Sequence, residues 1–450
     1  MRMQNRSWMP LILVAVTLAG CDPADWEAGV DEASAGAVLD AVAEDYVKLV
    51  LAVGQHDADY VDAYYGPEEW RTEAEARILA LEEIHGRADE MIRRIAAAEV
   101  PASDEMLGLR QRYLERQIEA LIARVEMLAG ESRSFDEESQ ALYDAVAPTR
   151  DEGHYQAVIY ELEGLLAAEG LTEGPFIDRY ETFRADFAIP PEKLDAVFQA
   201  AIEACRERTA GHIELPPGES FTVEYVTDKP WSGYNWYQGG YRSLIQVNTD
   251  LPIYIDRAVD LACHEGYPGH HLYNALLEKH LMRDRGWVEM SVYPLFSPQS
   301  LIAEGSANYG IDMAFPGDQR WRYEAEVLFP LAGLDADRAA AYYRIQEQVA
   351  KLSYAGNEAA RRYLDGDIDA DAAAEWLARF AAMEPARARQ RVSFIDKYRS
   401  YVINYNLGKD LVRCHVEARA GDDETRRWQV FEELLSTPRL PSDLDKCQDG

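Results

Sequence analysis

The sequence CHEGYPGHH at residues 263–271 directs the interpretation of the whole chain, because it holds three histidines and a glutamate within nine residues. It lies inside an apolar, helix-like run from Ile255 to Leu281. A His-Glu pair on a helix, with a further histidine one turn later, is how zinc hydrolases assemble metal ligands and a general base. The second histidine usually follows the first by four residues, and here that position is Pro268.

Pro268 changes the geometry that a straight helix would give. At about 100° and 1.5 Å per residue, His264 and His271 would share a face but lie roughly 10 Å apart, and His270 would point away. Pro268 cannot donate an N–H to the carbonyl of His264, and Gly269 adds backbone freedom. A kink or bulge that absorbs about two residues would return His270 to the i+4 phase. We therefore expect His264 and His270 as metal ligands, with His271 as the alternative ligand or a supporting donor.

The motif resembles the signature of a bacterial family known as domain of unknown function 885, which is HExxPGH followed by a glutamate in an E-G-x-A-x-Y setting. The chain reads HEGYPGH at residues 264–270 and EGSANY at residues 304–309. Residues 399–408, RSYVINYNLG, are similar to the family's R-Y-x-x-x-P-x-x-x-x-Y-x-x-G segment but lack its proline. The resemblance is strongest from Tyr225 to Gly408. It implies a mostly helical metallopeptidase-like protein related to carboxypeptidase Taq.

The resemblance makes Glu304 the predicted third ligand of a single Zn²⁺ ion, since a catalytic zinc needs about three protein ligands and one open position. Alone, Glu304 would be interpreted as a surface glutamate. Residues 297–300, SPQS, begin its helix with capping chemistry, and Gly305 and Ala307 would let a second helix approach closely. Glu265 is expected to act as the general base on metal-bound water, whose pKa the ion lowers toward about 7.

Three further side chains are assigned roles around this centre. Tyr405 or His271 is expected to donate a hydrogen bond to the oxyanion that forms during hydrolysis. Arg399 is expected to hold a substrate carboxylate through its planar fork. The alternatives are that Tyr405 belongs to the core and that Arg399 forms a surface ion pair. Asn308, one turn beyond Glu304, is expected to orient a ligand.

Residues 220–250 contain the predicted sheet. Residues 221–226 alternate in a strand-like pattern, and residues 234–238 and 241–247 flank a Gly-Gly pair that predicts a hairpin. An edge strand beside the metal helix would let a substrate backbone add to the sheet. The aromatic residues that we expect at such a cleft are Tyr234, Trp236 and Tyr241; the alternative is that each packs into the core.

Most of the remaining chain has helical periodicity, including residues 37–53, 68–98 and 105–128. The predicted fold is mainly α: a large, zincin-like multi-helix bundle with one small antiparallel sheet beside the metal helix. Residues 56–67, HDADYVDAYYGP, are rich in Asp, His and Tyr. They fit either a contribution to the site or a capped junction between helices.

Residues 1–20 are predicted to be a lipoprotein signal peptide, because Arg2 and Arg6 precede an apolar run that is too short to span a membrane. The run ends in LAGC, which resembles a lipoprotein signal whose lipid is carried by Cys21; an ordinary secretory signal is the alternative. Residues 21–36 are predicted to be a tether and residues 37–450 a single metallopeptidase-like domain. The expected location is extracytoplasmic, attached to a bacterial membrane, on the periplasmic side in a Gram-negative host.

The net charge of −35 argues against nucleic acid as the main partner, since nucleic acid needs a basic face. Hydrophobic residues make up 48% of the chain, which permits a large core and excludes disorder. Thiols outside the cytoplasm tend to pair. We expect Cys414 to pair with Cys447, and Cys263 to be a core residue rather than a ligand.

The leading functional hypothesis is a zinc peptidase, carboxypeptidase-like, that acts on a peptide or small acyl substrate. One alternative is a metal-dependent amidase or esterase that acts on non-peptide bonds. The other alternative belongs to a different class: a non-catalytic, helical binding lipoprotein.

Overall fold

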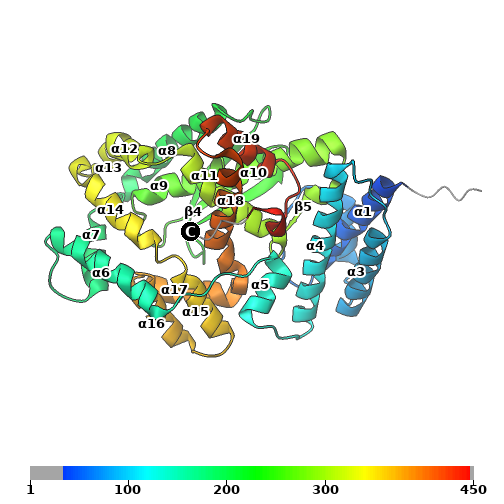
Figure 1. Cartoon of the computed structure of the whole chain (residues 1–450), viewed down its shortest axis with the longest axis horizontal. Coiled ribbons are helices and arrows are strands. Elements are labelled where there is room, and N and C mark those ends of the chain that lie inside the picture. Colours follow the sequence, from blue (N-terminus) through cyan, green and yellow to red (C-terminus); the bar gives the residue numbers. More distant parts are fainter. Residues whose placement is uncertain (1–33, 446–450) are drawn as a thin grey trace, which may run out of the picture.

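The structure, a computed structural model, describes residues 34–445 and is mainly α-helical with two small sheets (Figure 1). This confirms the predicted fold class. The predicted signal peptide and Cys21 lie outside the described residues. Helix α1 (Ala35–Val53) includes the last two residues of the predicted tether, 35 and 36. No helix within residues 34–445 is both long and apolar enough to cross a membrane.

Three helices pack together at the end of the molecule that carries the N-terminus: α1, α3 (Leu81–Ala96) and α4 (Glu105–Leu128) (Figure 1). The predicted single helix at residues 68–98 is wrong. It is broken between α2 (Glu68–Ala76) and α3, where the ring of His56 lies 2.7 Å from the carbonyl oxygen of Leu79. A contact from outside the segment therefore replaces the helical hydrogen bond. The helices that follow are α5 (Phe135–Tyr143), α6 (Glu152–Ala168), α7 (Phe176–Ala185) and α8 (Leu194–Ala210).

The larger sheet has the order β2-β4-β3. Strands β3 (Gly233–Gly239) and β4 (Arg242–Asn248) form the predicted antiparallel hairpin. Strand β2 (Ser220–Val226) joins β4 in parallel, so the sheet is mixed rather than purely antiparallel. A second sheet pairs β1 (Val61–Tyr64) with β5 (Val292–Pro294), and β1 comes from the Asp- and Tyr-rich stretch between the first helices.

The metal-motif segment breaks completely where a kink was predicted. Helix α9 (Asp256–Leu261) continues into a π-helical turn, η2 (Ala262–Gly266), and α10 (His270–Leu277) begins after a cis peptide bond at Pro268. A Cβ atom on Gly269 would lie 1.8 Å from the carbonyl oxygen of His264. The turn therefore requires glycine at this position.

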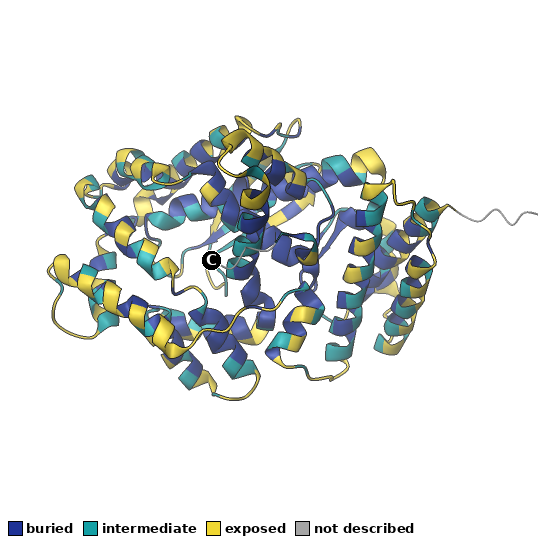
Figure 2. Ribbon diagram, in the orientation of Figure 1, coloured by how far each residue is buried: buried dark blue, intermediate teal, exposed yellow. Residues whose placement is uncertain are grey.

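Helix α11 (Pro298–Ala314) packs against α18 (Ile403–Ala420) in the buried centre of the molecule (Figure 2). A Cβ on Gly305 would lie 2.4 Å from the backbone of Gly408, so this crossing depends on two glycines. The surrounding helices are α12 (Gln319–Tyr323), α13 (Phe329–Ala332), α14 (Ala339–Ala350), α15 (Ala355–Leu364), α16 (Ala370–Phe380), α17 (Pro385–Tyr398) and α19 (Glu424–Leu435).

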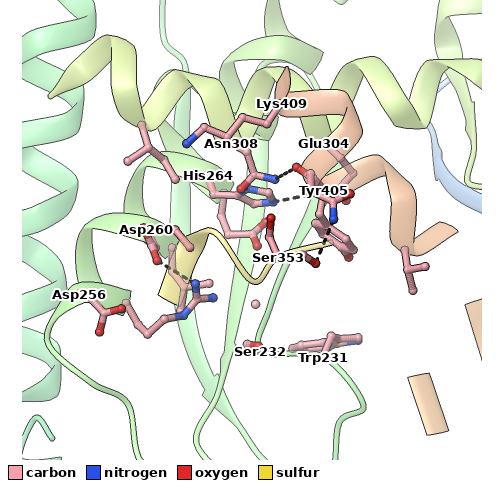
Figure 3. Close-up of a pocket in the computed structure, with 18 of the residues that line it drawn as sticks. Trp231, Ser232, Asp256, Asp260, His264, Glu304, Asn308, Ser353, Tyr405 and Lys409 are labelled. Carbon is pink, nitrogen blue, oxygen red and sulfur yellow. Dashed lines mark hydrogen bonds and ion pairs between the residues drawn. The ribbon is translucent and has the colours of Figure 1, made fainter. Parts of the chain in front are cut away.

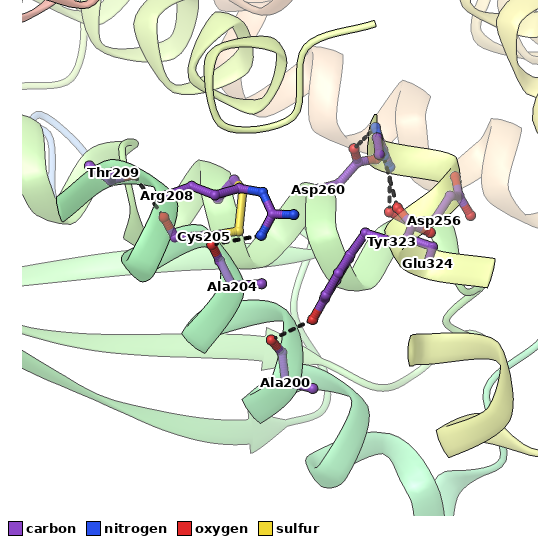
Figure 4. The surroundings of a disulfide bond; sticks show 11 residues. Ala200, Ala204, Cys205, Arg208, Thr209, Asp256, Asp260, Tyr323 and Glu324 are labelled. Carbon is purple, nitrogen blue, oxygen red and sulfur yellow. Dashed lines mark hydrogen bonds and ion pairs between the residues drawn. A yellow bond between two sulfur atoms is a disulfide. The ribbon is translucent and has the colours of Figure 1, made fainter. Parts of the chain in front are cut away.

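Cys263 is fully buried, as expected of a core residue, and it also forms a disulfide bond with Cys205 of α8 (Figure 4). The bond joins α8 to the residue immediately before the first histidine of the motif. Cys414 is also disulfide-bonded. Cys447, its predicted partner, lies outside the described residues.

Candidate metal centre

The break at Pro268 brings the imidazole rings of His264 and His270 close together. Their Nε2 atoms lie 3.1 Å apart, and the two rings are nearly perpendicular. His264 is held on the π-helical turn and His270 is the first residue of α10. The two histidines that spacing alone would separate therefore point at the same small volume.

Asn308 determines which nitrogen of His264 faces that volume (Figure 3). The Asn308 amide donates through Nδ2 to the carbonyl oxygen of Tyr405 at 3.1 Å, which leaves its Oδ1 facing Nδ1 of His264 at 3.2 Å. An amide oxygen only accepts hydrogen bonds, so Nδ1 carries the proton. The lone pair of His264 is then on Nε2, the nitrogen that faces His270.

Glu304 of α11 completes the cluster. Its Oε2 lies 3.2 Å from Nε2 of His264, and its Oε1 lies 3.7 Å from Nε2 of His270. The hydroxyl of Tyr401 donates to Oε1 at 2.7 Å, whereas Oε2 is buried without a hydrogen-bond partner. Burial would raise the pKa of Glu304, but the two histidines lower it overall, so this carboxyl is ionised.

These donor atoms fit a zinc ion. Tetrahedral bonds of 2.0–2.1 Å place neighbouring ligand atoms about 3.3 Å apart. The separations of 3.1, 3.2 and 3.7 Å among the facing atoms of His264, His270 and Glu304 are close to that value. Two imidazoles and a carboxylate form a ligand set that is common in catalytic zinc sites, and the partnerless Oε2 atom is a ligand atom without another role.

Glu265 lies beside this cluster, with a ligand atom within 4.8 Å of those of both histidines. It is nearly fully buried, and burial raises the pKa of its carboxyl to about 7. A Cβ on Gly233 of β3 would lie 2.9 Å from Oε1 of Glu265, so the sheet edge makes room for the carboxylate. Glu304 is the better candidate for the third ligand, because Glu265 is adjacent to His264 and cannot easily bind the same ion.

Tyr405 is the predicted hydrogen-bond donor of the site. It lines the same cavity, and its ring meets that of Tyr401 edge to face at 5.8 Å. Burial raises the pKa of Tyr405 well above its usual value, and the charges of Glu304 and Glu265 raise it further. The phenol therefore keeps its proton and can donate it in a hydrogen bond.

The expectation that His271 is a ligand or donor in the site is wrong. His271 is fully buried on the opposite side of α10, where Nε2 lies 3.1 Å from Glu219 and Nδ1 lies 2.8 Å from Oγ of Ser243. Tyr267 and Arg206 also bond to Glu219. Consecutive helix residues point about 100° apart, so only one of the adjacent histidines can face the cavity.

Arg399 is not a substrate-binding residue of the cavity. Its Nε donates to Oε2 of the buried Glu138 at 2.6 Å. The same carboxylate accepts hydrogen bonds from the backbone and the hydroxyl of Ser400. Arg399 therefore stabilises the turn between α17 and α18, as the ion-pair alternative proposed.

Of the three aromatic residues expected at the cleft, only Tyr234 lines the cavity, and its hydroxyl donates to Asp62. Trp236 is 40% exposed and donates to Gln246 on the solvent side of the sheet. Tyr241, at the turn of the hairpin, stacks under Arg283. The prediction that Trp236 and Tyr241 belong to the substrate site is therefore wrong.

The cavity has a volume of about 980 Å³, and the side chains that line it include several that the sequence did not reveal as functional candidates, among them Asp62, Arg387, Arg391 and Tyr401. Two of these had a signal: Asp62 lies in the Asp- and Tyr-rich stretch at residues 56–67, and Tyr401 lies in the family-like segment at residues 399–408. Burial raises the pKa of Asp62 to about 6, although its bond with Tyr234 and the nearby His270 oppose that rise.

Comparisons with known proteins add little to this geometry. No family model matches the chain, and no curated protein matches it. A candidate lipoprotein from Colwellia psychrerythraea is 14% identical, with a TM-score of 0.48 over 79% of this chain and 69% of that one. A candidate lipoprotein of unknown function from Shewanella oneidensis is 13% identical, with a TM-score of 0.39 over 81% and 75%. A structure described as that of CHT is 12% identical, with a TM-score of 0.42 over 89% and 91%. These likenesses are too distant to carry a functional argument, so the resemblance to family 885 rests on the motifs alone.

Proposed function

We propose that this protein is a zinc-dependent hydrolase that cleaves a peptide bond in the cavity beside His264. The observation that carries the proposal is the convergence of two imidazole nitrogens and a partnerless, buried carboxylate oxygen at the separations that one zinc ion requires. A buried carboxylate oxygen without a hydrogen-bond donor, such as Oε2 of Glu304, would be costly as a purely structural feature.

The chain's own groups have distinct roles in this proposal. A bound zinc ion supplies Lewis-acid chemistry, by which it polarises a carbonyl group and lowers the pKa of water toward about 7. Glu265 takes a proton from the attacking water and then delivers it to the leaving amine, which suits a carboxyl with a pKa of about 7. Tyr405 donates a hydrogen bond to the oxygen of the scissile carbonyl as negative charge develops there.

Metal analysis tests the ligand set. We expect about one zinc per wild-type chain, and loss of that zinc in His264→Ala, His270→Ala and Glu304→Gln. The matched control is His154→Ala, which removes an exposed histidine of α6 and should leave the zinc content unchanged. Full zinc content in all three ligand variants would overturn the proposed site.

The role of the base is tested separately with Glu265→Gln. This variant should retain zinc but hydrolyse a panel of blocked peptides at least 100-fold more slowly, since general-base catalysis contributes about 10²–10⁴-fold. Cleavage of esters or non-peptide amides with no cleavage of peptides would favour the amidase or esterase alternative. Absence of both zinc and hydrolysis in the wild type would favour a binding protein.

We also propose that the chain is extracytoplasmic and lipid-anchored through Cys21. Support comes from the LAGC sequence at residues 18–21 and from the disulfide bonds of Cys263 and Cys414, which are typical of an oxidising compartment. Fractionation of cells that express Cys21→Ser tests this, because that variant should leave the membrane fraction.

A further inference from the structure

The cationic side chains of the cavity fall into two groups. Six Lys and Arg residues line it, and four of them pair with carboxylates at 2.8–2.9 Å: Arg257 and Arg320 with Asp260, Lys409 with Asp312, and Arg413 with Asp410. The other two, Arg387 and Arg391, form no side-chain hydrogen bond or ion pair with any residue that the structure describes. In a chain with 80 acidic and 45 basic residues, two unpaired guanidinium groups in one cavity need an explanation.

Arg391 is the one of these two arginines that contacts a residue of the candidate site, Tyr405. Its Nε is buried without an acceptor, and its guanidinium lies 4.6 Å from the centre of the Phe394 ring and 5.7 Å from that of Tyr405. Burial lowers the pKa of Arg391, and the nearby Tyr405 and Glu304 offset only part of that effect, since neither forms an ion pair with it. Since Tyr405 also lies near Glu265, an anion bound to Arg391 would sit one side chain away from the reacting bond.

Arg387 lies one helical turn before Arg391 on α17, about 6 Å along the helix axis. It is half-buried beside two other cations: burial lowers its pKa and the neighbouring Arg184 and Arg257 lower it further, against smaller opposing effects of Tyr254 and Glu181. Arg257 shares Asp260 with Arg320, so its charge is only partly neutralised. Neighbouring like charges are unfavourable unless an anion lies between them.

We propose that Arg391 and Arg387 form a two-part carboxylate subsite, which makes the preferred substrate a peptide whose carboxyl-terminal residue is acidic. Arg391 binds the terminal α-carboxylate and Arg387 binds the side-chain carboxylate of glutamate or aspartate. The separation of one helical turn suits two carboxylates on one residue, whereas a phosphate would draw both guanidinium groups to a single point. As a statement about substrates, this rests on the proposed peptidase function.

Calorimetry tests the subsite without any turnover. The probes are N-acetylglutamate, N-acetylglutamine and N-acetylglutamine amide, which carry two, one and no carboxylates. Each charged hydrogen bond should strengthen binding about 10–100-fold, so the full-length wild type should bind them in that order. Arg387→Gln should abolish the preference for glutamate over glutamine, and Arg391→Gln should weaken the binding of both acids.

Arg389→Gln is the matched control, because Arg389 is exposed on the same helix and its loss changes the net charge equally. It should bind all three probes as the wild type does. Equal binding of the three probes to the wild type would overturn the subsite, and so would tighter binding of inorganic phosphate than of N-acetylglutamate. Circular dichroism of each variant checks that α17 remains folded.

Hydrolysis of N-blocked Ala-Glu and Ala-Gln separates this inference from the proposed function. A wild-type kcat/KM that is about 10–100-fold higher for Ala-Glu, with the difference lost in Arg387→Gln, supports both. Arg387-dependent binding of N-acetylglutamate without hydrolysis of either peptide retains the subsite and removes the peptidase. Hydrolysis of both peptides at equal rates retains the peptidase and removes the subsite.

Discussion

Asn308 holds the imidazole of His264 through its amide oxygen and, through its amide nitrogen, ties α11 to the backbone of α18. Removing the amide in Asn308→Leu would free the ring to rotate and leave its tautomer undetermined. We expect zinc affinity to fall about 10–100-fold, as is usual when a group that orients a ligand is lost. Competition with a chelator measures this affinity.

Asn308→Asp is the control for that change, because a carboxylate at the same position still accepts from Nδ1 of His264. Its zinc affinity should stay within about threefold of the wild type or increase. Unchanged affinity in Asn308→Leu, with a native circular dichroism spectrum, would mean that the amide does not orient the ligand.

The sequence predicted the functional roles of some residues but not of others. His264, His270 and Glu304 were predicted from a motif, because their types and spacing carry the chemistry. Arg399 was misassigned, since its partner Glu138 lies 261 positions away and no local pattern shows that contact. Arg391 was missed because its distinguishing feature is a buried Nε atom that has no hydrogen-bond partner. Only the folded structure reveals such an absence.

At the level of elements, the crossing of α11 and α18 sets the distance between the third ligand and its tyrosines. A Cβ on Gly305 would meet the backbone of Gly408 at 2.4 Å, and backbone atoms cannot move aside as a flexible side chain would. Gly305→Ala should therefore lower the free energy of unfolding by about 2–4 kcal/mol, within the range for overpacking or worse. It should also weaken zinc binding, since Glu304 is the adjacent residue.

Gly164→Ala provides the comparison, because Gly164 is exposed in the middle of α6 and a Cβ there meets nothing within 4 Å. That change should stabilise the protein by about 0.5–1 kcal/mol through helix propensity. Urea unfolding of both variants measures the two effects. Equal stability of Gly305→Ala and the wild type would show that the helices can separate at no cost.

The elements themselves were predicted where the local sequence controls them. The hairpin of β3 and β4 follows from its Gly-Gly turn, and α4 has the predicted limits. The β1–β5 sheet was not foreseen, because its strands have four and three residues and lie more than 200 positions apart. The break between α2 and α3 was also missed, and the contact made there by the ring of His56 comes from 23 positions earlier in the chain.

Across the whole molecule, the cavity collects side chains from Asp62 to Arg413. The metal-motif segment is held in place by contacts on its side away from the cavity. The disulfide bond joins it to α8, and Glu219 joins it to the sheet and to α8 through His271 and Arg206. The same network that excludes His271 from the cavity therefore holds His270 in place.

Glu219 makes this anchor sensitive to acid. Burial would raise the pKa of its carboxyl, but hydrogen bonds from His271, Tyr267 and Arg206 lower it to about 2. A carboxyl whose pKa is lower in the folded state than in the unfolded chain stabilises the fold above the unfolded value, near 4.3. That contribution is lost as the pH falls from about 5 to 2.

Glu219→Gln should therefore be less stable than the wild type at pH 7, and the difference in the free energy of unfolding should shrink as the pH falls toward 3. Urea unfolding of both proteins at pH 7, 5, 4 and 3 measures that difference. Glu224→Gln is the control, because Glu224 is an exposed residue of the neighbouring strand, and its stability should follow the wild type throughout. If the difference between Glu219→Gln and the wild type is the same at every pH, ionised Glu219 is not what anchors the segment, and His270 must be held by packing and the disulfide bond instead.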